Sequence, residues 1–259
     1  MFAKVKPNTR IIGQNIIYFN QIDSSNAIAL ELMKQNLAGD GTVILAEFQG
    51  KGRGQGNKHW ISDAFENLLF SVVLLPVTKS DPDPFILNKA IALSIYETIQ
   101  ALLPDASVKI KWPNDILINS RKVCGILLEN NYNARKLNWC IAGVGINVNQ
   151  DFDSEAGLNA TSLKRWQGSE VPREPLLQTL LERMDKHYLD LLSGKQDGIQ
   201  KAFDEALSGY AVSGQFTHEG HTFKAILRGC DGDGRLLLET EDGKVRPWLH
   251  GQIKQVIYE

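Results

Sequence analysis

A glycine-rich segment, residues 49–60 with the sequence QGKGRGQGNKHW, has the composition of a ligand-binding loop. Its glycines alternate with Lys51, Arg53 and Gln55, so exposed backbone and positive charge occur together. Glycine loses more conformational freedom on ordering than any other residue, so we expect this backbone to approach a ligand closely. An anion is the expected ligand, with Trp60 as an apolar wall over it. The alternative is a solvated linker.

The loop differs from the common phosphate-binding loops, because it contains neither G-x-x-x-x-G-K-[ST] nor G-x-G-x-x-G. A formal net charge of −2 also gives no electrostatic footprint for binding bulk nucleic acid. The anion is therefore expected to be a local, small ligand.

Two later segments carry further polar groups. In the first, KIKWPND, Pro113 breaks a strand and leaves Asn114 and Asp115 at its end, where a metal or a ribose hydroxyl could be held. The alternative there is a simple Pro-Asn-Asp turn. In the second, RKVCGIL, Lys122 lies between solvent and core and could reach a phosphate, while Gly125 permits close backbone approach. Most lysines at such junctions are only solvated.

A glycine-containing strand and a strand-to-helix turn complete the candidate site. Gly143 and Gly145 lie on one face of the segment AGVGIN, as the floor of a pocket requires, and Asn147 follows at its polar end. Ser24 and Ser25 precede an amphipathic helix, where free backbone amides can hold a polar ligand atom. The alternative for these serines is a role as helix N-caps only.

The elements that must position these residues indicate an α+β fold. A strand over residues 16–19 is expected to be buried and a helix follows over residues 27–37. Further strands are predicted at residues 43–46, 67–75, 108–112, 116–119, 123–129 and 139–148, and further helices at residues 88–103, 174–192 and 198–208. Short connections make the later strands antiparallel neighbours.

From residue 213 onward the helical periodicity ends and five short β-like runs follow, separated by Gly-containing turns. We expect a main domain over residues 1–209 and a small β-barrel over residues 210–259. A unit of this size needs the surface of the main domain to bury its core.

The chain has no apolar segment of signal-peptide or membrane-spanning length, which predicts a cytoplasmic protein that does not bind membranes. Its three cysteines, Cys124, Cys140 and Cys230, lack metal-site spacing and lie in apolar stretches. Buried, reduced thiols are expected.

Together, residues 49–60, 111–115, 121–127 and 143–147 resemble, in this order, the catalytic core of biotin–protein ligases, also called biotin–[acetyl-CoA-carboxylase] ligases. Residues 244–253 are similar to the end of the same family's SH3-like domain. The resemblance implies a mixed, largely antiparallel sheet with flanking helices, like that of class II aminoacyl-tRNA synthetases, followed by a small SH3-like β-barrel.

The resemblance also implies a two-step reaction. ATP and biotin give biotinyl-5′-AMP and pyrophosphate, and the biotinyl group then passes to one lysine of a biotin carboxyl carrier domain of acetyl-CoA carboxylase. It implies ATP and Mg²⁺ as cofactors, biotin as substrate and a monomer or homodimer. Because the chain begins almost at its first catalytic strand, we expect no DNA-binding domain and no DNA partner.

Residue roles follow from the same resemblance. The implied catalytic residues are Lys122, Arg53 and Asp115. The implied biotin-binding residues are Ser24, Ser25, Gln49, Gly52, Arg53, Trp60, Lys122, Gly125, Gly143 and Gly145. The implied ATP-binding residues are Arg53, Lys111, Asn114, Asp115, Lys122 and Asn147. No fixed metal site is implied, and Mg²⁺ is expected with ATP near Asp115 and Asn147.

One departure from the family concerns Gln55 and Gly56, which stand where relatives that hold the adenylate very tightly carry further arginine. We therefore expect this chain to release biotinyl-AMP more readily. The alternatives to a biotin–protein ligase are a lipoate or octanoyl ligase of the same superfamily and a non-catalytic nucleotide-binding protein.

Overall fold

A computed structural model of the chain describes residues 2, 5–56, 58–76, 83–133, 136–152 and 159–256. The first part of the chain forms β1 (Ile16–Ile22), α1 (Ser25–Lys34), β2 (Val43–Gln49), β3 (Leu68–Leu74), α2 (Ile86–Leu102), β4 (Val108–Lys111), β5 (Asp115–Ile118), β6 (Arg121–Asn133), β7 (Lys136–Ile146), α3 (Leu163–Gln167), α4 (Arg173–Leu192) and α5 (Gln196–Ala206). The last part forms β8 (Ser213–His218), β9 (His221–Cys230), β10 (Leu236–Thr240), β11 (Val245–Trp248) and β12 (Lys254–Val256).

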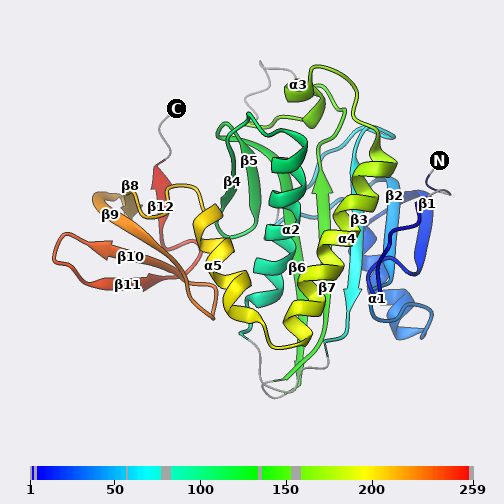
Figure 1. Cartoon of the computed structure of the whole chain (residues 1–259), viewed down its shortest axis with the longest axis horizontal. Helices are drawn as coiled ribbons and strands as arrows, with labels where there is room; N and C mark the ends of the chain where they lie inside the picture. The colour runs from blue at the N-terminus through cyan, green and yellow to red at the C-terminus, as the bar shows by residue number, and fades with distance from the viewer. Residues whose placement is uncertain are drawn as a thin grey trace.

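Two sheets organise these elements (Figure 1). The larger has seven strands in the order β1-β2-β3-β7-β6-β5-β4, and the smaller has five in the order β11-β10-β9-β8-β12. In the larger sheet only β1 and β2 are parallel neighbours, and α1 forms the crossover between them. All other neighbouring strands are antiparallel. The predicted α+β class with a mixed, largely antiparallel sheet is confirmed.

The first strand corrects the sequence prediction, which expected it to be buried. β1 lies at the edge of the sheet and pairs only with β2, so most of its side chains are partly or fully exposed, and Tyr18 is 37% exposed. Its apolar and aromatic residues are equally typical of an edge strand and of a central strand. The sequence pattern alone therefore does not distinguish these two positions. β3 is the fully buried central strand that was predicted.

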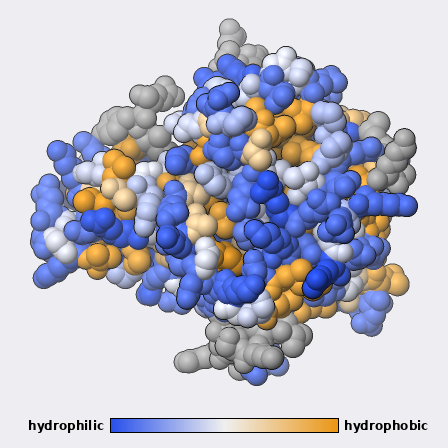
Figure 2. Space-filling model, viewed as in Figure 1, coloured by the Kyte–Doolittle hydropathy of each residue, from blue (hydrophilic) through white to orange (hydrophobic). Residues whose placement is uncertain are grey.

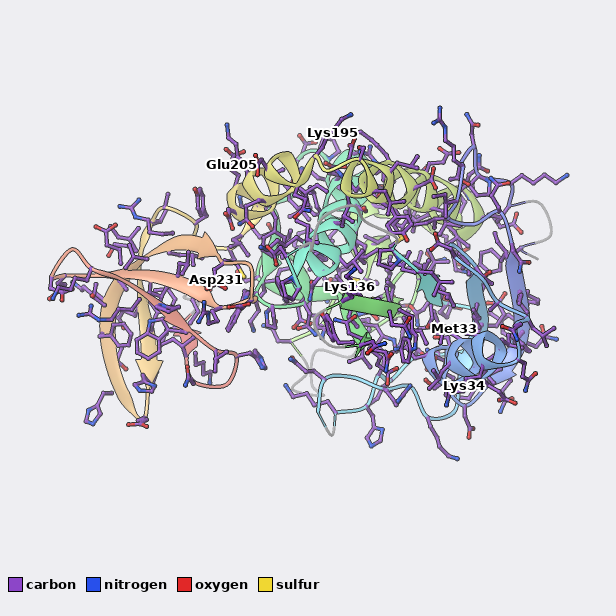
Figure 3. The ribbon with its side chains drawn as sticks, turned by 90° about the horizontal axis from the view of Figure 1, so that it is seen from below. Met33, Lys34, Lys136, Lys195, Glu205 and Asp231 are labelled. Atoms are coloured by element: carbon purple, nitrogen blue, oxygen red, sulfur yellow. The ribbon has the colours of Figure 1, made fainter. Side chains whose placement is uncertain are left out.

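Helices cover both faces of the large sheet. Val43 and Leu45 point into the core shared with α2 and α4, whereas Ile44 packs beneath α1, because successive strand residues point to opposite faces. Figure 3 shows this arrangement, with α1, labelled at Met33 and Lys34, across the sheet from α4 and α5. Hydrophilic residues cover most of the helical face in Figure 2, with hydrophobic residues in scattered patches.

The small sheet contains the five strands predicted after residue 213, and its first hairpin turns at Glu219 and Gly220, with φ of 48° and 80°. Phe216 and Leu227 of this sheet belong to the same buried cluster as Phe203 of α5. A continuous core therefore crosses the predicted boundary between residues 209 and 210. The small sheet therefore shares buried contacts with the main part of the chain.

A buried lysine joins the two sheets. Lys89 of α2 is completely buried, and its Nζ donates to Asp83 Oδ2 at 2.9 Å and to the backbone oxygen of Asp231 at 2.9 Å. Figure 3 labels Asp231 at this junction. Nearby, Trp112 Nε1 donates to the backbone oxygen of Gly234 at 2.9 Å. These contacts fix the small sheet against the end of β4.

The cysteines are buried and free, as predicted. Burial raises the pKa of the Cys124 thiol far above its ordinary value, so this residue stays protonated although it lies beside Lys122 in sequence. Within the ranges of the chain described above, none of the helices combines the length and the apolarity needed to span a membrane.

Candidate active site

The sheet end where β2, β5, β6 and β7 meet the glycine loop holds a cavity of about 230 Å³. Most of the predicted site residues line it, namely Ser24, Ser25, Gln49, Arg53, Trp60, Lys111, Asn114, Asp115, Lys122, Gly125, Gly143 and Gly145. Segments far apart in sequence are thus brought to one place.

Two predicted site residues do not line this cavity. A Cβ at Gly52 would lie 2.6 Å from the backbone oxygen of Trp60, so the missing side chain lets the two limbs of the loop pair. Asn147 is buried, and its Nδ2 donates to the backbone oxygen of Thr161 at 3.1 Å. In this structure Gly52 shapes the loop and Asn147 fixes the chain after β7.

The start of α1 is tied to the glycine loop. Gln49 Oε1 accepts a hydrogen bond from the backbone N–H of Ser25 at 2.7 Å. Ser24 occupies the N-cap position, yet its hydroxyl makes no capping bond and accepts from Arg53 Nε at 3.4 Å. The two serines therefore face the cavity, which the N-cap alternative alone does not explain.

Arg53 is held by a carboxylate that the sequence analysis did not single out. Its Nη1 and Nη2 donate to Glu129 Oε1 and Oε2 at 3.0 and 2.8 Å, a forked pair that fixes the guanidinium plane. Asn26 Nδ2 also donates to Glu129 Oε2 at 2.7 Å. The charge predicted to meet phosphate is already paired in this structure.

Lys122 is also paired, with Asp115 Oδ1 at 2.6 Å, and its Nζ lies 5.5 Å from the centre of the Trp60 ring. A register shift between β5 and β6 pairs Ile116 with Cys124 but Leu117 with Lys122. Such a bulge re-aims side chains, and it explains how Lys122 and Gly125, three positions apart, both face the cavity.

The strand glycines provide room for other side chains of the protein. A Cβ at Gly145 would lie 2.5 Å from Trp60 Cε2, and one at Gly125 would lie 2.9 Å from Trp60 Cζ3. A Cβ at Gly143 would lie 2.3 Å from Asn26 Oδ1. The indole therefore packs against two of the predicted floor glycines, Gly125 and Gly145. Its buried Nε1 has no hydrogen-bond partner among the described residues.

A buried serine lies behind two residues of the cavity lining, Ser25 and Asn26. Ser71 Oγ of β3 lies 2.5 Å from Asn26 Oδ1 and 2.7 Å from Ser25 Oγ. This serine interrupts the otherwise apolar strand sequence LLFSVVL. It is completely buried, so its hydroxyl needs these partners.

Two cations at the cavity have no carboxylate partner within the described ranges. Lys58 and Lys111 line the cavity and form no ion pair with any residue that the structure describes. Their positive charge is available to an incoming anion, whereas Arg53 and Lys122 would exchange a carboxylate for it. The site is suited to binding a polyanion.

The small sheet also reaches the cavity. His250 lines it, with its ring centre 5.5 Å from that of Trp112 and its Nδ1 3.4 Å from Gln55 Nε2. Partial burial lowers the pKa of the His250 imidazole, and the positive charge of Lys58 lowers it further, while Asp115 acts in the opposite direction.

Sequence reasoning gave no role to several of these residues. Asn26 follows Ser25 directly, Lys58 lies in the glycine loop, and Ser71 is a lone hydroxyl in an apolar strand, so each carried a local signal. Glu129 and His250 carried none, because only the folded sheet and the docked small sheet bring them to the cavity.

Comparison with known proteins places this geometry in context. The model of the biotin/lipoate A/B protein ligase family matches residues 18–147. A biotin–[acetyl-CoA-carboxylase] ligase of Paracoccus denitrificans is 36% identical over 230 residues, covering 86% of this chain and 93% of that protein. A bifunctional ligase/repressor of Bacillus spizizenii is 33% identical over 238 residues, covering 91% of this chain and 72% of that protein.

A solved structure agrees with the sequence matches. The biotin protein ligase of Aquifex aeolicus, in complex with biotin and ATP, is similar with a TM-score of 0.76 and 25% sequence identity. The match covers 94% of this chain and 99% of that chain, so it includes both sheets. On the strength of the family match, the sequence relatives and the shared fold, this chain belongs to the biotin/lipoate A/B protein ligase family.

Proposed function

We propose that this protein is an ATP-dependent biotin–protein ligase, which activates biotin as biotinyl-5′-AMP and transfers biotin to a lysine of an acceptor protein. The observation that carries the proposal is the cavity of about 230 Å³, where polar side chains, paired cations and unpaired cations converge. The sequence relatives named as biotin ligases, and the similar enzyme solved with biotin and ATP, support this function.

In the first step, a carboxylate oxygen of biotin attacks the α-phosphorus of ATP, and the bond to the β-phosphate breaks to release pyrophosphate. Two anions must approach each other, so fixed positive charge contributes more than a covalent nucleophile. Lys122 exchanges Asp115 for a phosphoryl oxygen, and Lys111 and Lys58 meet the outgoing phosphates. Cys124 does not supply a nucleophile, because burial raises the pKa of its thiol.

The polar end of the cavity is the proposed site for the ureido ring of biotin. Ser24, Ser25 and Gln49 present hydroxyl, amide and carbonyl groups there, and Asn26 lies beside them. A ureido group both donates and accepts hydrogen bonds, which such a mixed set can match. Trp60 covers the apolar part of the ligand.

Magnesium is proposed to accompany ATP. Asp115 lines the cavity and offers a carboxylate, whereas the side chain of Asn147 is bonded to the backbone of Thr161 and lies away from it. The described residues contain no group of three or more His, Cys, Asp and Glu side chains arranged for a metal. A single carboxylate fits Mg²⁺, which at nucleotide sites takes most ligands from phosphates and water. When bound, Mg²⁺ neutralises phosphate charge.

In the second step, the amine of the acceptor lysine attacks the acyl carbon, the bond from that carbon to the phosphate oxygen breaks, and AMP leaves with the electron pair. The amine loses a proton, and Asp115 is the carboxylate at the cavity that can accept it. The acceptor we propose is the carboxyl carrier domain of acetyl-CoA carboxylase, because the name of the Paracoccus denitrificans relative specifies this enzyme.

A lipoate or octanoyl ligase is the nearest alternative, since the matching family model includes lipoate ligases. The Paracoccus denitrificans relative, which is similar over most of this chain, is named as a biotin–[acetyl-CoA-carboxylase] ligase, and this favours biotin. A non-catalytic nucleotide-binding protein is a third alternative, and turnover separates it from both ligases.

The test is exchange of labelled pyrophosphate into ATP, with biotin or lipoate as the second substrate. We expect biotin-dependent exchange, and a loss of roughly 100-fold or more in Lys122→Ala, since one lost electrostatic contact to a transition state has about that effect. Lys109→Ala is the matched control, because this lysine lies on β4 of the same sheet and does not line the cavity. Exchange with lipoate alone, or none at all, would contradict the proposed function.

A further inference from the structure

One contact joins the tip of the glycine loop to the small sheet. Gln55 Nε2 lies 3.4 Å from His250 Nδ1, across 195 positions of sequence. Both side chains are at the exposed rim of the cavity, and both line it. The only hydrogen bond that the described residues make to the Gln55 side chain is therefore supplied by the small sheet.

His250 is itself held in place. Its ring packs against that of Trp112 at 5.5 Å between centres, and Trp112 donates from Nε1 to the backbone oxygen of Gly234. Two residues of the small sheet thus flank one tryptophan of the main domain. The imidazole therefore contacts both Trp112 and the side chain of Gln55.

The glycine loop, described at residues 49–56 and 58–60, lies beside this imidazole. Its two limbs pair through a bridge between Arg53 and His59, and the backbone N–H of Gly54 donates to the backbone oxygen of Lys58 at 2.8 Å. Gln55 follows at the tip, beside Gly56, where φ is 65°. A glycine-rich tip loses much conformational freedom when it closes, so a single side-chain contact there changes the closed population.

We propose that His250 is a positioning residue that holds the glycine loop closed over the cavity through Gln55, and that this contact slows the escape of the adenylate between the two half-reactions. The inference rests on the proposed function and adds a part of the site that the small sheet supplies. It also gives Gln55 a role different from that of an arginine contacting the ligand.

The electrostatic surroundings agree with this arrangement. The charged groups that act on His250 are Lys58 of the loop and Asp115 of β5, and partial burial together with Lys58 lowers the pKa of the imidazole. A neutral ring keeps one nitrogen as an acceptor, which the Gln55 amide can meet as donor.

The experiment measures how fast biotinyl-AMP leaves the enzyme. Wild-type protein, Gln55→Ala, His250→Ala and the double variant are loaded with biotin and ATP, and release of labelled adenylate is followed after dilution into unlabelled biotinyl-AMP. Each single variant should release the adenylate roughly five-fold faster, as for loss of one neutral hydrogen bond. The double variant should be no faster than either single variant, because both remove the same contact.

His221→Ala is the matched control, since this histidine also belongs to the small sheet and does not line the cavity. It should release the adenylate at the wild-type rate. Unchanged release rates in Gln55→Ala and His250→Ala would overturn the inference. So would a double variant whose increase in release rate equals the product of the two single increases. Wild-type protein that forms no adenylate would instead overturn the proposed function.

A second variant excludes a merely structural effect. Gln55→Glu places a carboxylate beside His250, and protonation of the imidazole then creates an ion pair. Release should become slower as pH falls through the pKa of His250, and this pH dependence should vanish in the Gln55→Glu/His250→Ala protein. A pH profile that survives removal of His250 would contradict the contact.

Discussion

Two of the cations at the cavity are held in ion pairs. Arg53 forks onto Glu129 and Lys122 contacts Asp115, so the two cations predicted to be catalytic are each held by a carboxylate. Each ion pair neutralises its cation and also holds that side chain in one orientation before substrate binds. Positioning and neutralisation are therefore two effects of one contact.

Replacing Glu129 with glutamine tests this coupling for Arg53. Glu129→Gln keeps the shape of the side chain and removes its charge, so the guanidinium loses its forked partner. Because the pair is partly exposed, with 43% and 35% of the two side chains accessible, we expect a cost of about 1 kcal/mol. Pyrophosphate exchange should fall roughly five-fold.

The control for this substitution is Glu241→Gln, an exposed residue of the small sheet that does not line the cavity. It should leave exchange unchanged. Exchange in Glu129→Gln at or above the wild-type rate would show that Glu129 restrains Arg53 rather than positions it.

Among the elements, β6 and β7 must carry glycine where they face Trp60, because a side chain there would collide with the indole. The sequence predicted glycines on one face of these strands, and the structure places them there. It did not predict that the indole would lie on Gly125 and Gly145, because the position of Trp60 depends on how the loop folds back. Sequence periodicity predicts which residues share one face of a strand. How a loop packs against that face is known only from the tertiary structure.

Gly145→Ala tests the fit between β7 and Trp60. The added Cβ would lie 2.5 Å from Cε2 of the indole, so the ring must move. Overpacking of this kind costs about 1–3 kcal/mol, and we expect the KM for biotin to rise roughly ten-fold. Steady-state exchange kinetics measure this change.

Gly198→Ala in α5 is the opposite control, because a Cβ there meets nothing within 4 Å and the residue is helical. It should raise the free energy of unfolding by about 0.5–1 kcal/mol and leave the KM unchanged. An unchanged KM for biotin in Gly145→Ala would mean that Trp60 does not lie over β7 when ligand binds.

The difference between local sequence pattern and tertiary packing also explains which other features could be predicted from the sequence. The antiparallel run from β4 to β7 was predicted because its short connections leave no alternative, and its strands were found within a few residues. The exposure of β1 was predicted wrongly, since burial at a sheet edge depends on strand order. Glu129 and His250 were missed because each meets the site only through partners distant in sequence.

For the whole molecule, Lys89 of α2 is a buried polar connection to the small sheet. Its ammonium is completely buried and is satisfied by Asp83, by the backbone oxygen of Asp231 and by Gln200 Oε1 at 2.5 Å. Lys89→Met would leave the Asp83 carboxylate, 19% exposed, without its charged partner. We expect a loss of about 3 kcal/mol in the free energy of unfolding, measured by chemical denaturation.

Lys201→Met is the matched control. Its ammonium lies 4.0 Å from Glu205 on the surface of α5, with 79% of the lysine side chain exposed. Such a pair contributes little, so the free energy of unfolding should change by less than about 0.5 kcal/mol. Equal losses in the two variants would argue against Lys89 as the connection between the sheets.

The run of antiparallel neighbours from β4 to β7 has a consequence for the order of folding. Strands joined by tight connections pair early, because little loop entropy is lost in closing them. Asp115 and Lys122 can therefore meet while later parts of the chain are still being synthesised. His250 leaves the ribosome much later, so a nascent chain would hold its charged pair before it can hold its loop closed.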